Sequence, residues 1–183
     1  MSLERLLRVL AGALSAAGIP SMLTGSLAAA FHGASRATMD VDLVIDPTTP
    51  ALDDFVRRVE ALGLYVSADA AREALAHCGM FNVVDPETGW KADLIVRKRR
   101  PFSETEFSRG EAADFFGVSL AVASLEDVIL SKLEWARLGA SGRQLEDVRA
   151  LLRIAGESVD RPYLEPWVDR LGVRAEWESV REC

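Results

Sequence analysis

The chain has 183 residues, of which 49% are hydrophobic and 27% charged, a composition that is typical of a globular protein with a core of its own. With 28 acidic and 21 basic side chains the net charge is -7, which excludes the broad positive field of a dedicated nucleic-acid coat and leaves only a local basic patch. The two cysteines, Cys78 and Cys183, lack the spacing of a zinc site, so we expect free thiols in a reducing, cytoplasmic compartment.

The first predicted element is an amphipathic helix near the N-terminus. Leucines recur there at helical spacing with charged residues between them, at Leu3, Leu6, Leu7, Leu10 and Leu14. The apolar segment 9–19 loosely imitates the centre of a signal peptide, but the leucine periodicity favours the helix. Gly18 and Pro20 end it, and residues 21–24 follow as a short buried strand. No apolar run is long enough to cross a bilayer.

Strands and helices then alternate up to about residue 123. We predict a brief helix over 27–32, a strand over 38–46, a helix over 53–62, a short strand and helix within 64–76, a hairpin of strands 79–84 and 90–96, and a strand over 116–122. Beyond residue 124 the pattern is helical, over 125–138, 144–154 and two short helices. The sequence therefore predicts an α/β (α+β) fold, a mixed sheet flanked by helices, with a core over 1–123 and a helical subdomain over 124–183 packed on it.

A Gly-Ser turn and a pair of acids are the most informative features. Gly25 and Ser26 lie between a strand and a helix, where backbone N–H groups and the helix dipole favour a phosphate; a simple helix cap is the alternative. Asp40 and Asp42 alternate with apolar residues, so a strand would point both carboxylates to one face, where they repel each other. A magnesium ion would relieve this repulsion, whereas a solvated strand face is the alternative.

A third carboxylate, Asp93, lies within an apolar strand, where an unpaired charge is costly. It is our candidate for a metal ligand and for the base that activates an acceptor hydroxyl, with a simple ion pair to a neighbouring Lys or Arg as the alternative. Glycine-rich phosphate loops of the kinds found in P-loop and dinucleotide-binding enzymes are absent from the sequence.

Taken together, Gly25-Ser26, Asp40-Val41-Asp42 and the later Asp93 resemble the signature of the nucleotidyltransferase superfamily with the DNA polymerase beta-like fold. The resemblance covers roughly residues 21–96. It implies that the Gly-Ser turn binds a nucleoside triphosphate and that the three aspartates hold two magnesium ions. It also implies that a nucleoside monophosphate, such as that of ATP, is transferred to an acceptor.

Within this superfamily the chain is similar to small prokaryotic stand-alone members, among them abortive-infection toxins of toxin–antitoxin pairs. Arg36, Thr38 and the segment 124–133 carry this likeness. It implies that Arg36, Thr38 and Lys132 bind the nucleotide, that Arg143 and Asp147 support the site, and that an antitoxin is a candidate partner. A solvated position on an exposed helix face is the alternative for the lysine and the second arginine.

A basic run, 97–100, directly follows the Asp93 strand and would place positive charge beside the site, where a polyanionic acceptor would lie; a solvated loop is the alternative. We interpret the four tryptophans as packing residues. The sequence thus predicts a magnesium-dependent nucleotidyltransferase, with a catalytically inactive nucleotide- or partner-binding module as the alternative. It does not identify the acceptor, for which RNA such as tRNA, a protein and a small molecule are candidates.

Overall fold

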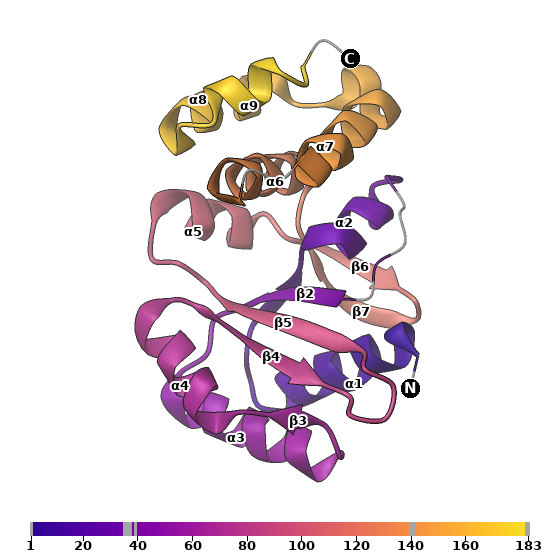
Figure 1. The fold of residues 1–183 in the computed structure, drawn as a ribbon, viewed down its shortest axis with the longest axis vertical. Helices are drawn as coiled ribbons and strands as arrows, with labels where there is room; N and C mark the ends of the chain where they lie inside the picture. The colour runs from indigo at the N-terminus through magenta and orange to yellow at the C-terminus, as the bar shows by residue number, and fades with distance from the viewer. Residues whose placement is uncertain (1, 35–37, 39, 140–141, 182–183) are drawn as a thin grey trace.

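The computed structural model describes residues 2–34, 38, 40–139 and 142–181. Within these residues the centre of the molecule is a mixed sheet of seven strands (Figure 1). In chain order the strands are β1 (Ser21–Leu23), β2 (Asp40–Ile45), β3 (Tyr65–Val66), β4 (Met80–Val84), β5 (Lys91–Val96), β6 (Glu111–Phe115) and β7 (Val118–Val122). Their order in space is β3-β4-β5-β2-β1-β7-β6. The combination of parallel and antiparallel pairs confirms the predicted mixed sheet.

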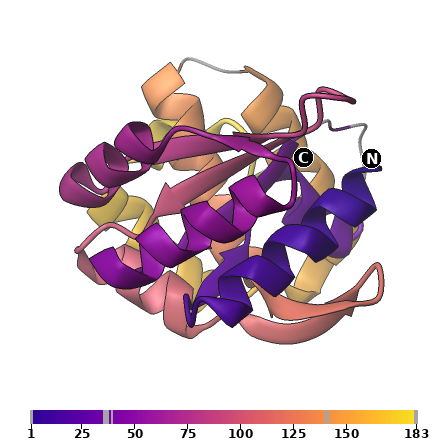
Figure 2. The ribbon, with the colours of Figure 1, turned by 90° about the horizontal axis from the view of Figure 1, so that it is seen from below.

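Helices occupy most of the remaining described chain. They are α1 (Leu3–Ala16), α2 (Gly25–Phe31), α3 (Thr49–Ala61), α4 (Ala68–His77), α5 (Pro101–Ser108), α6 (Leu125–Gly139), α7 (Gly142–Ala155), α8 (Arg161–Leu171) and α9 (Arg174–Glu178), with a 3-10 turn at Gly156–Ser158. Helices α1 and α3 run across one face of the sheet, and α4 lies beside α3 (Figures 1 and 2). Helices α6 to α9 gather at the other end of the molecule, which confirms the predicted helical C-terminal part (Figure 1).

The hydrophobic core follows the predicted periodicity. Four leucines of α1, at Leu6, Leu7, Leu10 and Leu14, are fully buried. Strands β2 and β5 contribute alternate apolar residues to the same core, including Val41, Leu43, Ala92 and Leu94. Because side chains alternate along a strand, the residues between them point to the opposite face. Asp42 and Asp93 occupy such positions.

The strands that carry the acids are parallel neighbours in exact register with each other. Asp42 on β2 stands opposite Asp93 on β5, and Asp40 stands opposite Lys91. On the far side of β5, Asn82 of β4 stands opposite Asp93. The sheet therefore brings together two carboxylates that lie far apart in the sequence.

Two elements were absent from the sequence prediction. Helix α5 follows the basic run, and β6 pairs with β7 as an antiparallel hairpin at the sheet edge. Helix α3 also begins earlier than predicted, at Thr49, because the Thr48 side chain accepts a hydrogen bond from the Ala51 N–H and caps it.

A buried polar cluster holds α6 in place. Asp127, fully buried on the first turn of α6, accepts hydrogen bonds from Ser124 Oγ (2.6 Å), Arg109 Nε (3.0 Å) and Tyr163 Oη (2.6 Å). The Arg109 guanidinium also lies 3.9 Å from the centre of the Tyr163 ring. Because these partners come from the end of α5 and from α8, the cluster joins the C-terminal helices to the sheet-bearing part and fixes which face of α6 looks toward the acids.

None of the helices in the described residues has the length and apolar character needed to cross a bilayer. Cys78 is a free thiol, as predicted, whereas Cys183 lies outside the described residues.

Candidate active site

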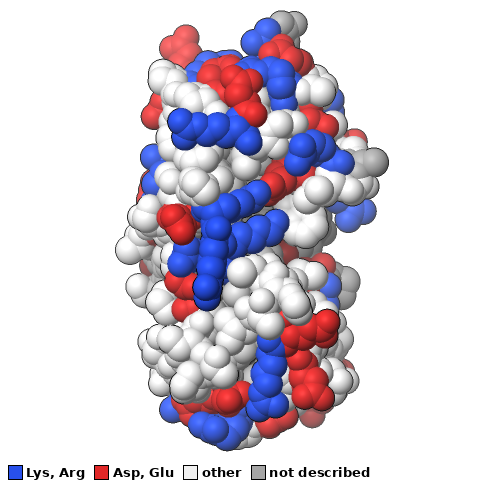
Figure 3. Space-filling view, turned by 90° about the vertical axis from the view of Figure 1, so that its left-hand side faces the viewer, with Lys and Arg blue, Asp and Glu red and all other residues white. Residues whose placement is uncertain are grey.

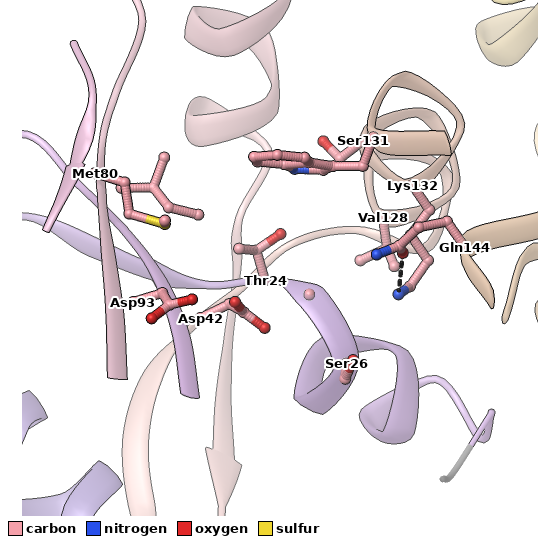
Figure 4. A pocket seen from close by; sticks show the side chains of 12 residues that line it. Thr24, Ser26, Asp42, Met80, Asp93, Val128, Ser131, Lys132 and Gln144 are labelled. Carbon is pink, nitrogen blue, oxygen red and sulfur yellow. Dashed lines mark hydrogen bonds between the residues drawn. The ribbon is translucent and has the colours of Figure 1, made fainter. Parts of the chain in front are cut away.

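A cavity of about 240 Å³, hereafter the main cavity, opens between the sheet and helix α6. It is lined by Thr24, which precedes α2, and by residues of α2, β2, β4, β5, α6 and α7, namely Gly25, Ser26, Asp42, Met80, Asp93, Ile95, Val128, Ser131, Lys132, Trp135 and Gln144. Figure 4 shows Asp42 and Asp93 next to each other, with Lys132 and Gln144 across the cavity from them. The structure thus gathers the Gly-Ser turn, two of the three predicted acids and the predicted lysine around one space.

The Asp42 carboxylate is the most electrostatically perturbed acid of this cavity. Burial, together with the negative charges of Asp93 and Asp40, raises its pKa to about 6, although a hydrogen bond from the Ser26 N–H and the charge of Lys132 act in the opposite direction. A buried carboxylate that a neighbouring carboxylate repels is stabilised by a cation. Asp42 and Asp93 therefore have the electrostatic character expected of a cation site.

Gly25 permits the close approach of the turn to Asp42. Its φ is +63°, and a Cβ atom added there would lie 2.1 Å from Asp42 Oδ2. The backbone is held in place because the Thr24 N–H donates to the Asp42 carbonyl oxygen at 3.0 Å. In this state the Ser26 N–H, which the sequence assigned to a phosphate, donates to the Asp42 carboxylate. The turn and the acid therefore form one unit at the start of α2.

We expect Gly25→Ala to lower the free energy of unfolding by about 2–5 kcal/mol, because it adds a backbone strain to a steric clash with Asp42. Gly63→Ala is the matched control, since Gly63 has a φ of +78° but no atom within 4 Å of the added Cβ. Its expected cost is the backbone strain alone, about 1 kcal/mol. Urea denaturation of both variants measures the difference, and equal losses would contradict the proposed close contact.

Asp93 is held from two sides. Asn82 Nδ2 donates to Asp93 Oδ1 at 2.6 Å, and Lys91 Nζ lies 3.1 Å from the same oxygen. Lys91 Nζ also lies 3.7 Å from Asp40 Oδ1. Although partial burial alone would lower the pKa of Lys91, the hydrogen bond and charge of Asp93 raise it. The ion pair that was the alternative interpretation of Asp93 is therefore present, and it leaves the Asp93 carboxylate on the cavity wall.

The donor set fits a magnesium ion in its chemistry. Asp42 and Asp93 present carboxylate oxygens to the main cavity, and oxygen is the ligand atom that magnesium prefers. Asp40 is 46% exposed at its side chain and faces Lys91 rather than lining the cavity. Among the described residues no three His, Cys, Asp or Glu side chains form a ready metal cluster. Two of the three predicted ligands thus line one cavity, whereas Asp40 would have to leave Lys91 to join them.

Lys132 is buried on α6 and ion-paired. Its Nζ lies 2.7 Å from Asp147 Oδ2 and donates to Gln144 Oε1 at 3.1 Å (Figure 4). The sequence predicted that Lys132 would reach the triphosphate and that Asp147 would support the site with Arg143. The structure places Asp147 against the lysine, while Arg143 is exposed and does not line the main cavity.

Of the two predicted residues upstream of the acids, Thr38 is described by the structure and is not among the residues that line the main cavity. Thr38 Oγ1 lies 3.3 Å from both the backbone N and the backbone O of Asp40, so its observed contact is with the start of β2. Arg36 lies outside the described residues.

Several cavity residues were missed by the sequence analysis. Trp135, interpreted as a packing residue, is 51% exposed and lines the main cavity, whereas Trp177 is fully buried as expected. Met80, which is 48% exposed, lines the cavity from β4. The helical spacing of Val128, Ser131, Lys132 and Trp135 was the available signal, because positions three and four apart share one face of a helix.

Comparison by sequence finds no matching family model and no matching curated protein. Comparison of structures finds the antibiotic-resistance factor ANT(2'')-Ia in complex with adenylyl-2''-tobramycin, with a TM-score of 0.61 and 14% identity over 96% of this chain and 99% of that one. It also finds a nucleotidyltransferase-like antigen of Paracoccidioides brasiliensis (TM-score 0.57, 18% identity, 98% and 92% covered). A third match is the lincosamide adenylyltransferase LnuA with lincomycin (TM-score 0.54, 11% identity, 84% and 98% covered).

These similarities extend over nearly the whole chain and confirm the fold that the Gly-Ser turn and the aspartates predicted. At such low identity it is the arrangement of the elements that is shared. The chain has the fold of the nucleotidyltransferase superfamily.

Proposed function

We propose that the protein is a magnesium-dependent nucleotidyltransferase that transfers a nucleoside monophosphate from a nucleoside triphosphate, with ATP as the first candidate, to an acceptor hydroxyl. The observation that carries the proposal is the in-register placement of Asp42 and Asp93 in one cavity with Gly25 and Ser26. The adenylyltransferases among the similar structures support the same reaction class.

The turn and helix α6 would hold the triphosphate from opposite sides. The Ser26 hydroxyl would donate to phosphate oxygens, and so would the N–H groups at the start of α2 once the Ser26 N–H leaves the Asp42 carboxylate. Lys132 adds a positive charge across the cavity. Between them, Met80 and Trp135 offer apolar walls on which a nucleobase would pack, and an aromatic face suits any of the four bases. The main cavity thus combines polar groups for phosphates with a surface for the base.

Asp93 is the proposed base. Its carboxylate accepts the proton of the acceptor hydroxyl as the new O–P bond forms at the α-phosphorus and pyrophosphate leaves. Asn82 and Lys91 would fix the carboxylate in one orientation. Asp42 and Asp93, with Asp40 after it leaves Lys91, would hold magnesium. When bound, the metal neutralises charge that develops on the phosphate oxygens.

Two linked measurements test this function. Magnesium with each of the four nucleoside triphosphates is expected to raise the melting temperature, because a ligand at about a hundred times its Kd stabilises the folded state by about 2.7 kcal/mol. With α-labelled nucleotides and a cell extract, label is expected to enter RNA, protein or a small molecule, and EDTA is expected to stop this transfer. Stabilisation without transfer in any fraction would instead support the binding-module alternative. The absence of both stabilisation and transfer would refute the enzyme hypothesis and the binding-module hypothesis alike.

The toxin role and the antitoxin partner stay predictions of the sequence resemblance. Both require that the protein works in the cytoplasm, where nucleoside triphosphates are supplied. A neighbouring gene whose product binds the protein and blocks the labelled transfer is the expected result.

A further inference from the structure

A second, smaller space branches from the main cavity. This side cavity has a volume of about 70 Å³ and shares Thr24, Ile95, Ser131 and Trp135 with the main cavity. Its size suits a few water molecules or one phosphate group, and it is too small for a nucleoside or a drug-sized ring system. A molecule that extends from the side cavity past these shared residues arrives at the wall that carries the two aspartates.

Three cations of the basic run line the side cavity. They are Arg97, Lys98 and Arg100, which come from the segment between β5 and α5. Arg97 Nε is buried and has no hydrogen-bond partner in the described structure. Lys98 is exposed and makes no ion pair among the described residues. Figure 3 shows a cluster of Lys and Arg side chains midway along this face of the molecule.

The acids of the side cavity do not cancel this charge. Glu134 is occupied by Arg100, whose two terminal nitrogens lie 2.5 Å and 2.6 Å from its oxygens. Glu106, 6% exposed, accepts a hydrogen bond from Ser131 Oγ at 2.7 Å. Burial raises the pKa of Glu106 to about 7, so near neutral pH a large part of this group is uncharged. The terminal nitrogens of Arg97 are engaged as well, since Nη2 lies 2.8 Å from Asp46 Oδ2 and Nη1 lies 4.0 Å from Glu104 Oε1. The groups left to act on a ligand are therefore Arg97 Nε and Lys98 Nζ.

We infer that the side cavity binds a phosphate group of the acceptor, so that the molecule receiving the nucleotidyl group is itself phosphate-bearing. The inference rests on the proposed function and names the acceptor class that it leaves open. A phosphate here accepts from Arg97 Nε and Lys98 Nζ, donors that suit an anion. The hydroxyl of the same molecule then reaches past Thr24 toward Asp93. A polycationic acceptor would meet like charges at this entrance.

The basic surface continues beyond the side cavity. A groove of about 600 Å³ shares Arg100 and Glu134 with it and is also lined by Arg137 and Arg170. A mononucleotide or sugar phosphate would use the side cavity alone, whereas the 3' end of an RNA strand would place further phosphates along this groove. The two sources of the phosphate are thus distinguishable by experiment.

The test compares matched acceptors with label supplied by an α-labelled nucleotide and magnesium. The acceptors are adenosine 5'-monophosphate, adenosine, ribose 5-phosphate, ribose, an RNA tetranucleotide with a free 3' hydroxyl, and tobramycin as a polycation. We expect transfer to a phosphate-bearing member at a kcat/KM at least tenfold above that of its unphosphorylated match. Arg170→Glu is expected to reduce transfer to the tetranucleotide only.

Lys98→Glu and Arg99→Glu form a matched pair of charge reversals. Both residues are exposed and adjacent, but only Lys98 lines the side cavity. Lys98→Glu is expected to lower the acceptor kcat/KM at least tenfold and to leave the stabilisation by magnesium and nucleotide unchanged, while Arg99→Glu stays within twofold of the original protein. Equal effects of the two variants, or transfer to adenosine or tobramycin as efficient as to the phosphate-bearing probes, would overturn the inference.

Binding provides a readout that does not depend on turnover. Calorimetry with magnesium and a non-hydrolysable nucleotide in saturating amounts measures the affinity of the same probes. If no probe is labelled and none shows Lys98-dependent binding, the inference is wrong. Loss of the nucleotide-induced stabilisation itself marks failure of the proposed function rather than of the acceptor site, because that measurement contains no acceptor.

Discussion

Replacing Asp42 with Asn is expected to reduce nucleotidyl transfer at least a hundredfold while making the metal-free protein more stable at about pH 8. In the proposed site Asp42 is a charged metal ligand, and its loss would remove about 3 kcal/mol or more of transition-state stabilisation, which corresponds to about a hundredfold in rate. The gain in stability arises because burial and the charge of Asp93 raise the pKa of Asp42 from 3.8 to about 6. Ionisation of this carboxyl group therefore lowers the stability of the folded protein.

The sign and the pH range of this gain follow from that pKa. Below pH 3.8 the carboxyl group is protonated in both the folded and the unfolded state, so the substitution is expected to change little. As the pH rises through about 6, the folded state loses up to about 3 kcal/mol relative to the unfolded state, and Asp42→Asn is relieved of this loss. Urea denaturation with EDTA at about pH 4 and about pH 8 measures the difference.

Asp53→Asn is the control for the removal of one negative charge. Asp53 lies on α3 and does not line the main cavity, and its Oδ1 accepts a hydrogen bond from Arg72 Nε at 3.0 Å. Neither transfer nor the pH dependence of stability is expected to change in this variant. A loss of stability in Asp42→Asn at both pH values, together with normal transfer, would mean that Asp42 serves the fold and not the reaction.

Lys132→Met is expected to lower the free energy of unfolding by about 3–5 kcal/mol, the usual cost of removing one partner of a buried ion pair. Both side chains of the pair are largely buried, with 4% exposed for Lys132 and 9% for Asp147. The proposed role in binding triphosphate predicts a second effect, a weaker stabilisation by magnesium and nucleotide. Denaturation and thermal shift measure the two effects separately.

The double variant Lys132→Met/Asp147→Leu separates the structural role of the pair from its functional role. Replacing a buried ion pair with apolar side chains of similar volume is often neutral for stability, so most of the lost free energy is expected to return. Nucleotide binding is expected to stay weak, because the positive charge is still missing from the main cavity. Recovery of nucleotide binding in the double variant would show that Lys132 acts through packing alone.

Local sequence signals predicted the sheet, the helical C-terminal part and the position of the Gly-Ser turn, but they failed for two elements. Helix α5 has no clear apolar stripe, because two of its three buried side chains are the polar Ser103 and Glu106. Strand β6 consists of the sequence EAADF, in which alanines and acids replace the β-branched residues typical of strands. It forms because β7 supplies a partner along its whole length.

The candidate site shows the same division between local and long-range information. The position of Asp42 on the cavity wall was predictable, because its neighbours in the chain are apolar and a second acid lies two positions away. The partners of Asp93 were not predictable in this way, since Asn82 faces it only through the register of β4 against β5. The exposure of Trp135 depends on how the Asp127 cluster orients α6, a contact set that joins three separate parts of the chain.

The parallel register of β2 and β5 has a consequence for the choice of metal ion. Asp42 and Asp93 sit directly opposite each other, so the separation of their Cα atoms is set by the spacing of neighbouring strands, about 4.8 Å. A bound ion cannot push the two backbones apart without breaking a ladder of hydrogen bonds in the middle of the sheet. At the proposed metal site, this fixed backbone spacing would therefore limit how far the two carboxylates can separate, which would favour a small ion such as magnesium over a larger one such as calcium.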